Sequence, residues 1–271
     1  MKSAIILPLL GVLIAGCTQS HEQNLSEMSS TKPAYPTSPT VSFEISQDSV
    51  DSKPYLNKIK QVTYNMAKSY RDNLRISLED YLNQPSTNVS YSDHYNVSWI
   101  SDGVGASVVV VFYSEKPNEW KPVFSGAFGR DITAISWRTD AFGAEEPLLS
   151  VESYNSAGTR RINHTQLIYL QGSTAQIAFD LDTVTYEAPH MLKNGNEERW
   201  KLVQNFVVVS QGMNDNHSIP EIDVSGYEQT DVIHGQTIKS SSKEFISVGY
   251  TWDASSHRFI ETAEKNPVNS Y

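Results

Sequence analysis

Apolar side chains between residues 52 and 84 recur at the spacing of a helix. They follow one another at intervals of three, four, seven or eight residues, which places them on a single helical face. The stripe consists of Leu56, Ile59, Met66, Tyr70, Leu74, Leu78, Tyr81 and Leu82. Ser52 can cap the first turn and Pro85 ends the pattern. We therefore predict one amphipathic helix within residues 48–87, packed on the rest of the fold through this stripe. A helix that binds a partner or a membrane surface is the alternative.

The pattern changes to that of β-strands from residue 88. Val108–Tyr113 is a continuous β-branched and aromatic run, typical of a buried strand. A turn at Glu115–Asn118 and a new run at Trp120–Phe124 indicate a hairpin. Further candidate strands are 132–137, 148–154, 165–170, 176–179, 206–209, 221–227, 245–252 and 258–260. We predict that residues 88–271 form a mainly β domain of antiparallel sheets, as a sandwich, a barrel or a partial propeller-like fold, with the helix packed on it.

The first 47 residues do not resemble the rest. An apolar run from Ala4 to Ile14 follows Lys2 and is too short to span a bilayer. Residues 18–47 are rich in Ser, Thr, Pro, Gln and Glu, with prolines at every third position from Pro33 to Pro39. Such a segment buries too little apolar surface to offset its conformational entropy. We expect residues 17–47 to be a disordered tether, and a proline-rich ligand for a partner is the alternative.

The charge balance narrows the classes of partner. The chain has 31 acidic and 21 basic residues, a formal net charge of −10. A surface of that sign does not favour nucleic acid or anionic lipid. After the leader, no second apolar run approaches the length of a membrane span. The sequence therefore predicts a folded part outside the bilayer that binds no nucleic acid.

The only cysteine of the chain follows the apolar leader directly. The sequence Ile14-Ala15-Gly16-Cys17 resembles the lipobox of bacterial lipoproteins. The resemblance implies that residues 1–16 are a signal peptide. Cys17 would then carry diacylglycerol on its sulfur and a fatty acyl group such as palmitate on its amine, and would hold the protein on a membrane of the cell envelope. The alternatives are an ordinary secretory leader with a chance cysteine and an uncleaved anchor. In that family an Asp after the cysteine commonly retains the protein at the inner membrane, so Thr18 implies the outer membrane of a two-membrane cell.

Two segments of the β region resemble each other weakly. Pro147–Tyr154 can be aligned with Pro220–Tyr227, and the stretch from Leu167 to Ser173 with that from Val248 to Ala254. These units resemble the blades of FG-GAP-type β repeats, in which a calcium loop precedes such a strand. The loop from Met213 to Glu221 departs from that family, because Met and His occupy positions where acidic ligands belong. We therefore expect no calcium site in this loop.

The common catalytic motifs are missing from the sequence. It contains no G-x-S-x-G, H-E-x-x-H, P-loop or G-x-G-x-x-G pattern. His94, His164, His190, His217, His234 and His257 are scattered without metal-ligand spacing. Asp180 and Asp182 form a D-x-D pair that suits either a solvated turn or a weak cation site, and the turn is favoured. Tyr91, Tyr95, Trp99, Trp120, Trp137, Trp200 and Trp252 are expected to fill the core rather than to bind sugars or peptides.

These observations predict a lipid-anchored envelope protein without a recognisable active site. Apart from lipidation at Cys17, the sequence assigns no catalytic, metal-binding or ligand-binding residue and implies no cofactor. The favoured function is a non-catalytic binding or assembly module for an envelope protein or glycan. The alternatives are a hydrolase whose site is assembled from distant loops and a carrier of an apolar ligand in a β cavity.

Overall fold

Antiparallel strands make up most of the described chain. The computed structural model describes residues 53–84, 88–91, 94–116, 119–143, 146–210 and 219–264. The leader, Cys17, the tether and residues 211–218 of the calcium-like loop lie outside these ranges. The described strands form two antiparallel sheets, one of four strands and one of nine. This arrangement confirms the mainly β fold class.

Two helices replace the single helix predicted over residues 52–84. They are α1, Lys53–Tyr70, and α2, Leu78–Asn83. The chain leaves the helical path at Arg71, whose guanidinium pairs with Asp102. Helix α2 begins anew where the Ser77 hydroxyl accepts a hydrogen bond from the amide of Asp80 at 3.1 Å. The prediction of one continuous helix was therefore wrong between Arg71 and Ser77, because capping and a tertiary ion pair outweigh the periodicity there.

The helices nevertheless pack most of the predicted apolar stripe against the rest of the fold. Ile59, Met66 and Tyr81 belong to a core cluster with Ile100 and Phe112 of the four-stranded sheet. The Tyr81 hydroxyl extends the contact, because it donates to the carbonyl of Trp99 at 2.9 Å. No helix in the described part of the chain is both long and apolar enough to cross a membrane. The stripe is thus occupied by packing within the molecule.

The four-stranded sheet is a meander in the order β1-β2-β3-β4. Its strands are β1, Asn88–Tyr91; β2, Tyr95–Ile100; β3, Val108–Lys116; and β4, Glu119–Ala127. The β3–β4 pairing confirms the predicted hairpin. Val108 and Val110 of β3 face the helix cluster, whereas Val109 and Val111 pack on the larger sheet. Because both faces of β3 are covered, its sequence is continuously apolar instead of alternating.

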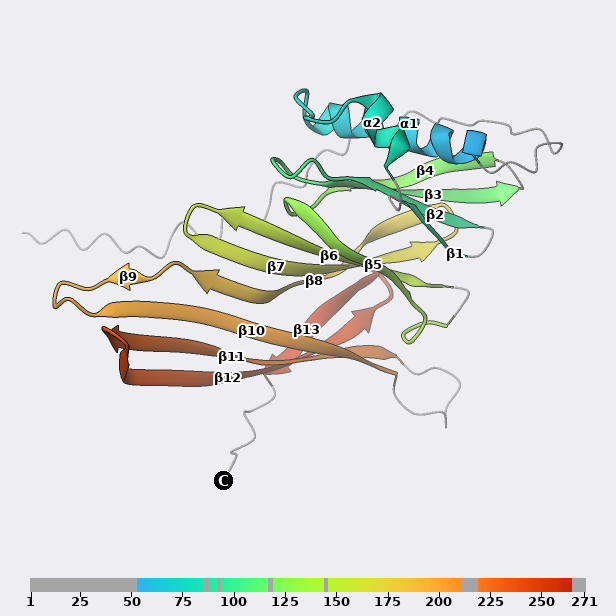
Figure 1. The fold of residues 1–271 in the computed structure, drawn as a ribbon. Helices are drawn as coiled ribbons and strands as arrows, with labels where there is room; N and C mark the ends of the chain where they lie inside the picture. The colour runs from blue at the N-terminus through green and yellow to red at the C-terminus, as the bar shows by residue number, and fades with distance from the viewer. Residues whose placement is uncertain are drawn as a thin grey trace, which may run out of the picture. The chain divides into compact units, whose positions relative to one another are not determined.

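The larger sheet follows the order β13-β12-β11-β10-β8-β7-β6-β5, and β9 also pairs with β10 (Figure 1). Its first strands are β5, Asp131–Arg138; β6, Leu148–Ala157; β7, Arg160–Gln171; β8, Thr174–Glu187; and β9, His190–Met191. The others are β10, Glu197–Ser210; β11, Pro220–His234; β12, Thr237–Asp253; and β13, Arg258–Glu264. The path of described strands runs from β13 to β5 without closing, so the fold is neither a barrel nor a single sheet.

The two faces of β6 and β7 belong to different cores. Leu149 and Ile168 pack against the four-stranded sheet. Their neighbours Leu148 and Leu167 join a separate cluster with Ile222 of β11 and other residues of β11 and β13. The larger sheet therefore curls so that its C-terminal strands cover the opposite face of β6–β8. Alternation along each strand supplies one apolar set to each core.

Candidate functional site

Cys17 and Thr18, the residues of the predicted anchor, lie outside the described residues. Three polar arrangements within the described chain are candidates for a functional site. Two of them are clusters of charged groups, and the third is a groove in the larger sheet. An arrangement whose charges neutralise one another has less capacity for chemistry than one with open hydrogen-bond donors and acceptors.

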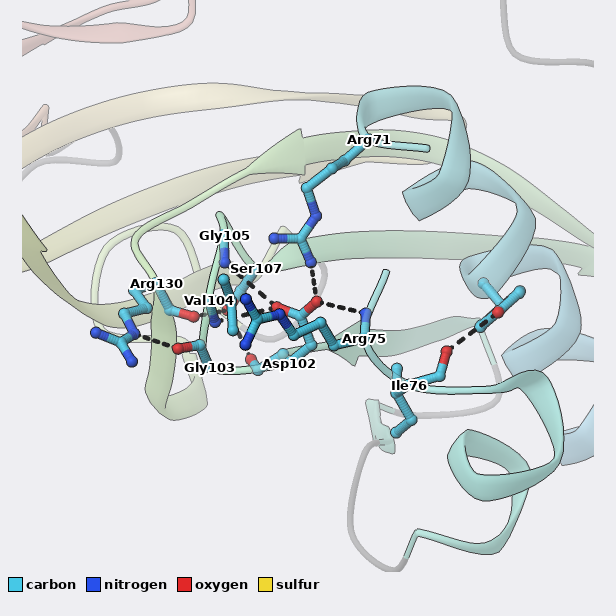
Figure 2. Close-up of polar contacts among 11 residues, drawn as sticks. Arg71, Arg75, Ile76, Asp102, Gly103, Val104, Gly105, Ser107 and Arg130 are labelled. Carbon is cyan, nitrogen blue, oxygen red and sulfur yellow. Dashed lines mark hydrogen bonds and ion pairs between the residues drawn. The ribbon is translucent and has the colours of Figure 1, made fainter. Parts of the chain in front are cut away.

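The first arrangement joins the end of α1 to the loop between β2 and β3 (Figure 2). The Arg71 guanidinium donates to Asp102, whose side chain is only 2% exposed. The same carboxylate accepts backbone amides of Arg75 at 2.9 Å, Val104 at 3.2 Å and Gly105 at 3.3 Å. Burial alone would raise the pKa of Asp102, but these donors outweigh it and hold the pKa well below its usual value.

The absence of a side chain at Gly105 makes this arrangement possible. A Cβ atom there would lie 1.5 Å from an Arg71 guanidinium nitrogen. Arg130 donates to the carbonyl of Gly103 and fastens the other side of the loop (Figure 2). With its charge matched and its carboxylate surrounded by donors, Asp102 holds the loop to α1 instead of presenting a reactive group. Nothing in the sequence pattern drew attention to Asp102.

The second arrangement brings one histidine between two aspartates on β7 and β8. His164 Nε2 lies 2.6 Å from Asp180 Oδ1, and its Nδ1 lies 2.6 Å from Asp182 Oδ1. Asp180 also accepts a hydrogen bond from Gln166 at 3.0 Å. The preference for a solvated turn at the D-x-D pair was wrong: both aspartates lie within β8. Alternation of a strand places them on one face, where they clamp the histidine.

Both ring nitrogens of His164 face carboxylates, so the cationic form suits the clamp. Burial would lower the pKa of His164, but the hydrogen bonds and charges of Asp180 and Asp182 outweigh it and raise the pKa to about 9. Burial likewise opposes ionisation of Asp180, and His164 overcomes it, so its pKa is lowered. Among the described residues, no three His, Cys, Asp or Glu side chains are placed to hold a metal ion. The clamp is an internal ion pair rather than a general base with a free nitrogen.

Lys60 is a further buried charge that the fold already uses. Lys60 is 8% exposed. Its ammonium group donates to the carbonyls of Leu82 at 3.3 Å and Gln84 at 2.6 Å. These carbonyls end α2, where a cation complements the helix dipole. Burial lowers the pKa of Lys60. The lysine thus fastens α2 to α1 and has no open approach of the kind a nucleophilic lysine needs.

The third arrangement is a groove of about 450 Å³ in the larger sheet. Strands β5 to β8 line it with Ser136, Arg138, Ser150, Glu152, Thr165 and Thr183. Across from them, β10 supplies Gln204, Asn205 and Phe206. Val184 of β8 completes the lining. We call this set the hydroxyl groove, because four of its ten side chains carry hydroxyl groups. Its polar lining does not suit an apolar ligand.

The groove lies where the larger sheet opens. β8 pairs with β10 only from Val184 to Tyr186. Thr183, the next residue, is left out of the β7–β8 register at a bulge, and its hydroxyl donates to the carbonyl of Asn163 at 3.1 Å. Bulges bend a strand and end regular pairing. The two strands diverge at this point, and the hydroxyl groove occupies the space beside it.

Most of the aromatic residues considered as binding candidates pack in the cores. Trp120 and Tyr95 are buried, and Trp137 packs on the cluster between the two sheets. Trp252 makes an edge-on ring contact with Phe142 of the β5–β6 connection and a tilted one with Tyr169 of β7, in the core that contains Leu148 and Leu167. Trp200 is partly exposed and donates to Glu228 at 2.5 Å. The core interpretation is thereby confirmed for Tyr95, Trp120, Trp137 and Trp252, but not for the partly exposed Trp200.

The segments aligned as a weak repeat occupy corresponding places in the sheet. Pro147 directly precedes β6, and Pro220 is the first residue of β11. Each strand then pairs with the next in an antiparallel meander, β6-β7-β8 or β11-β12-β13. The likeness to FG-GAP repeats itself stays a prediction.

Comparisons with known proteins add no assignment. No protein-family model matches the chain, and no curated protein or solved structure does so.

Proposed function

We propose that this protein is a lipid-anchored, non-catalytic binding or assembly module of a bacterial cell envelope. The observation that carries the proposal is the single cysteine, Cys17, placed directly after a short apolar leader and Ala15-Gly16. A lone thiol in an exported protein is exposed to oxidation unless it is capped. Thioether lipidation both caps it and provides the anchor.

The binding half of the proposal draws support from how the described charges are used. Asp102 is matched by Arg71, and His164 is held between two aspartates. Neither cluster leaves a base beside a nucleophile, the arrangement that nucleophilic catalysis requires. The hydroxyl groove, by contrast, offers several donors and acceptors to a ligand. A binding role therefore suits these residues better than the hydrolase alternative.

Fractionation of cells tests the anchor. We expect the wild type and the control Thr18→Ser in the membrane fraction, and Cys17→Ser in the soluble extract or as an uncleaved precursor, because serine cannot form the thioether. A processed Cys17→Ser chain that remains on the membrane would refute lipidation as the anchor.

A second substitution tests the proposed outer-membrane address. In a two-membrane cell, Thr18→Asp should move the protein to the inner membrane, whereas Thr18→Ser should not. Density-gradient separation of the two membranes measures the shift. A wild-type protein found in the inner membrane would contradict the outer-membrane proposal while leaving lipidation intact.

A further inference from the structure

We propose that the hydroxyl groove binds a neutral saccharide, one or two sugar rings of a longer glycan. The inference rests on the proposed binding function and names its ligand class. One face of the larger sheet changes from apolar to hydroxyl-bearing side chains along β6 and β7. Leu148 and Leu167 of this face lie in an apolar core. The same face carries Ser150, two residues after Leu148 on β6, and Thr165, two residues before Leu167 on the antiparallel strand β7.

These two hydroxyl residues are nearly buried yet lack protein partners. Ser150 and Thr165 are each 4% exposed, and both line the groove. Neither side chain is hydrogen-bonded to another described residue. Neither hydroxyl oxygen is among the buried polar atoms without a partner, so both reach the open groove, where water or a ligand can bond them. A ligand that both donates and accepts hydrogen bonds would satisfy both groups.

The strand register gathers further polar groups around them. Ser136 of β5 lies opposite Ser150 of β6, and Glu152 of β6 lies opposite Thr165 of β7. Glu152 is exposed and makes no ion pair with a described residue. A carboxylate can accept from two neighbouring hydroxyl groups of one ligand. Adjacent ring hydroxyls of a sugar have this chemistry.

The positive group of the groove is already neutralised. Arg138 donates to Asp140, with Nε at 3.2 Å from Oδ1. Its guanidinium also lies 5.3 Å from the centre of the Phe206 ring, a cation–π distance. An anionic ligand would therefore approach Glu152 and Asp140 without a free cation to balance it. A neutral ligand avoids this repulsion and can still accept a hydrogen bond from Arg138.

The size of the groove agrees with a small ligand. Its volume of about 450 Å³ falls within the range of about 300 to 1,000 Å³ that small-molecule sites occupy. An apolar molecule of that size would bury the hydroxyls of Ser150 and Thr165 without partners. A saccharide replaces the hydrogen bonds of water with its own hydroxyl groups, and its ring faces can contact Phe206.

Binding measured on the full-length protein in detergent tests the inference. An array of neutral, amino and acidic oligosaccharides identifies binders, and calorimetry with the best neutral disaccharide on the array gives Kd. We expect a neutral oligosaccharide to bind. Glu152→Gln and Thr165→Val should each weaken it about tenfold or more, as loss of one hydrogen bond to a buried or charged group does.

Two controls keep the result interpretable. Thr133→Val makes the same chemical change as Thr165→Val on an exposed residue outside the groove lining, and should leave Kd unchanged. Glu152 is exposed, so Glu152→Gln should fold even if Thr165→Val does not. Binding of only acidic oligosaccharides, no binding at all, or a Kd insensitive to Glu152→Gln would overturn the saccharide inference.

The outcome separates this inference from the proposed function. Lipidation plays no part in a detergent assay, so a failure to bind sugar leaves the anchor standing. Release of reducing ends from the bound saccharide would support the groove assignment and overturn the non-catalytic role. Binding without cleavage supports both.

Discussion

The histidine clamp on β7 and β8 makes the stability of the protein depend on pH in a defined direction. His164 binds its proton more tightly in the folded protein than in the unfolded chain, because its pKa is raised from 6.5 to about 9. The resulting stabilisation is complete below pH 6.5 and is lost as the pH rises through about 9. Because the pKa of Asp180 is lowered by His164, protonation of Asp180 should weaken the clamp only at a pH below the usual range of an aspartate.

The magnitude follows from the same pKa values. A rise of this size corresponds to about 3 kcal/mol of folding free energy when the histidine is fully charged. The side chain of His164 is 25% exposed, but that of Asp180 is 52% exposed, so solvent screens part of the interaction. We expect His164→Gln to cost about 1 to 2 kcal/mol at pH 6 and much less at pH 10.

Urea unfolding of the wild type and of His164→Gln at pH 6, 8 and 10 measures the loss of stability at each pH. His234→Gln is a matched control, because His234 lies 3.0 Å from the neutral amide of Asn196 and loses no carboxylate partner. Its cost should be small at each pH. An equal cost of His164→Gln at pH 6 and pH 10 would show that the histidine acts through packing alone, and would refute the clamp.

Three other predictions concern the helices and metals. Asp102→Asn leaves the Arg71 charge without a matching anion and should lower the free energy of unfolding by about 2 to 4 kcal/mol. A loss below about 0.5 kcal/mol, measured by urea titration, would contradict the buried ion pair. Leu74→Asp places a carboxylate against the helix core and should lower the free energy of unfolding by about 1 to 3 kcal/mol. Asn73→Asp, at an exposed position, should leave the stability unchanged. Equal stability of the two variants would show that Leu74 is dispensable. A chelator, or added calcium or zinc, should leave Tm unchanged, and a shift of several degrees in a thermal scan would disprove this.

The strands with covered faces were the most predictable part of the fold. The segment Val108–Tyr113 can be predicted as a strand from the sequence, because both faces of the strand are covered and every position is therefore apolar. The polar half of β12, from Thr237 to Glu244, gave no such signal, because its residues are exposed and its order comes from pairing with β11. The helix break at Arg71 depends on Asp102, which lies 31 residues away in the sequence. The spacing of apolar residues within the helix carries no information about so distant a partner.

The clamp and the groove were hidden for a related reason. Counting outward from the turn at Gly172 and Ser173 places His164 opposite Leu181. The bulge at Ala178 shifts the register by one residue, so His164 faces Asp182 instead. The hydroxyl groove similarly combines five strands and depends on where β8 and β10 part. No spacing within one segment carries that information.

The most direct test of the account is the mass of the membrane-extracted protein and of its N-terminal peptide. We expect a chain that begins at Cys17, without residues 1–16, and an N-terminal peptide that carries a diacylglycerol thioether and an amide-linked acyl chain. Cys17→Ser should lack both modifications. A wild-type chain cleaved elsewhere, or one that begins at Cys17 with an unmodified thiol, would contradict the central claim that this is a lipid-anchored envelope protein.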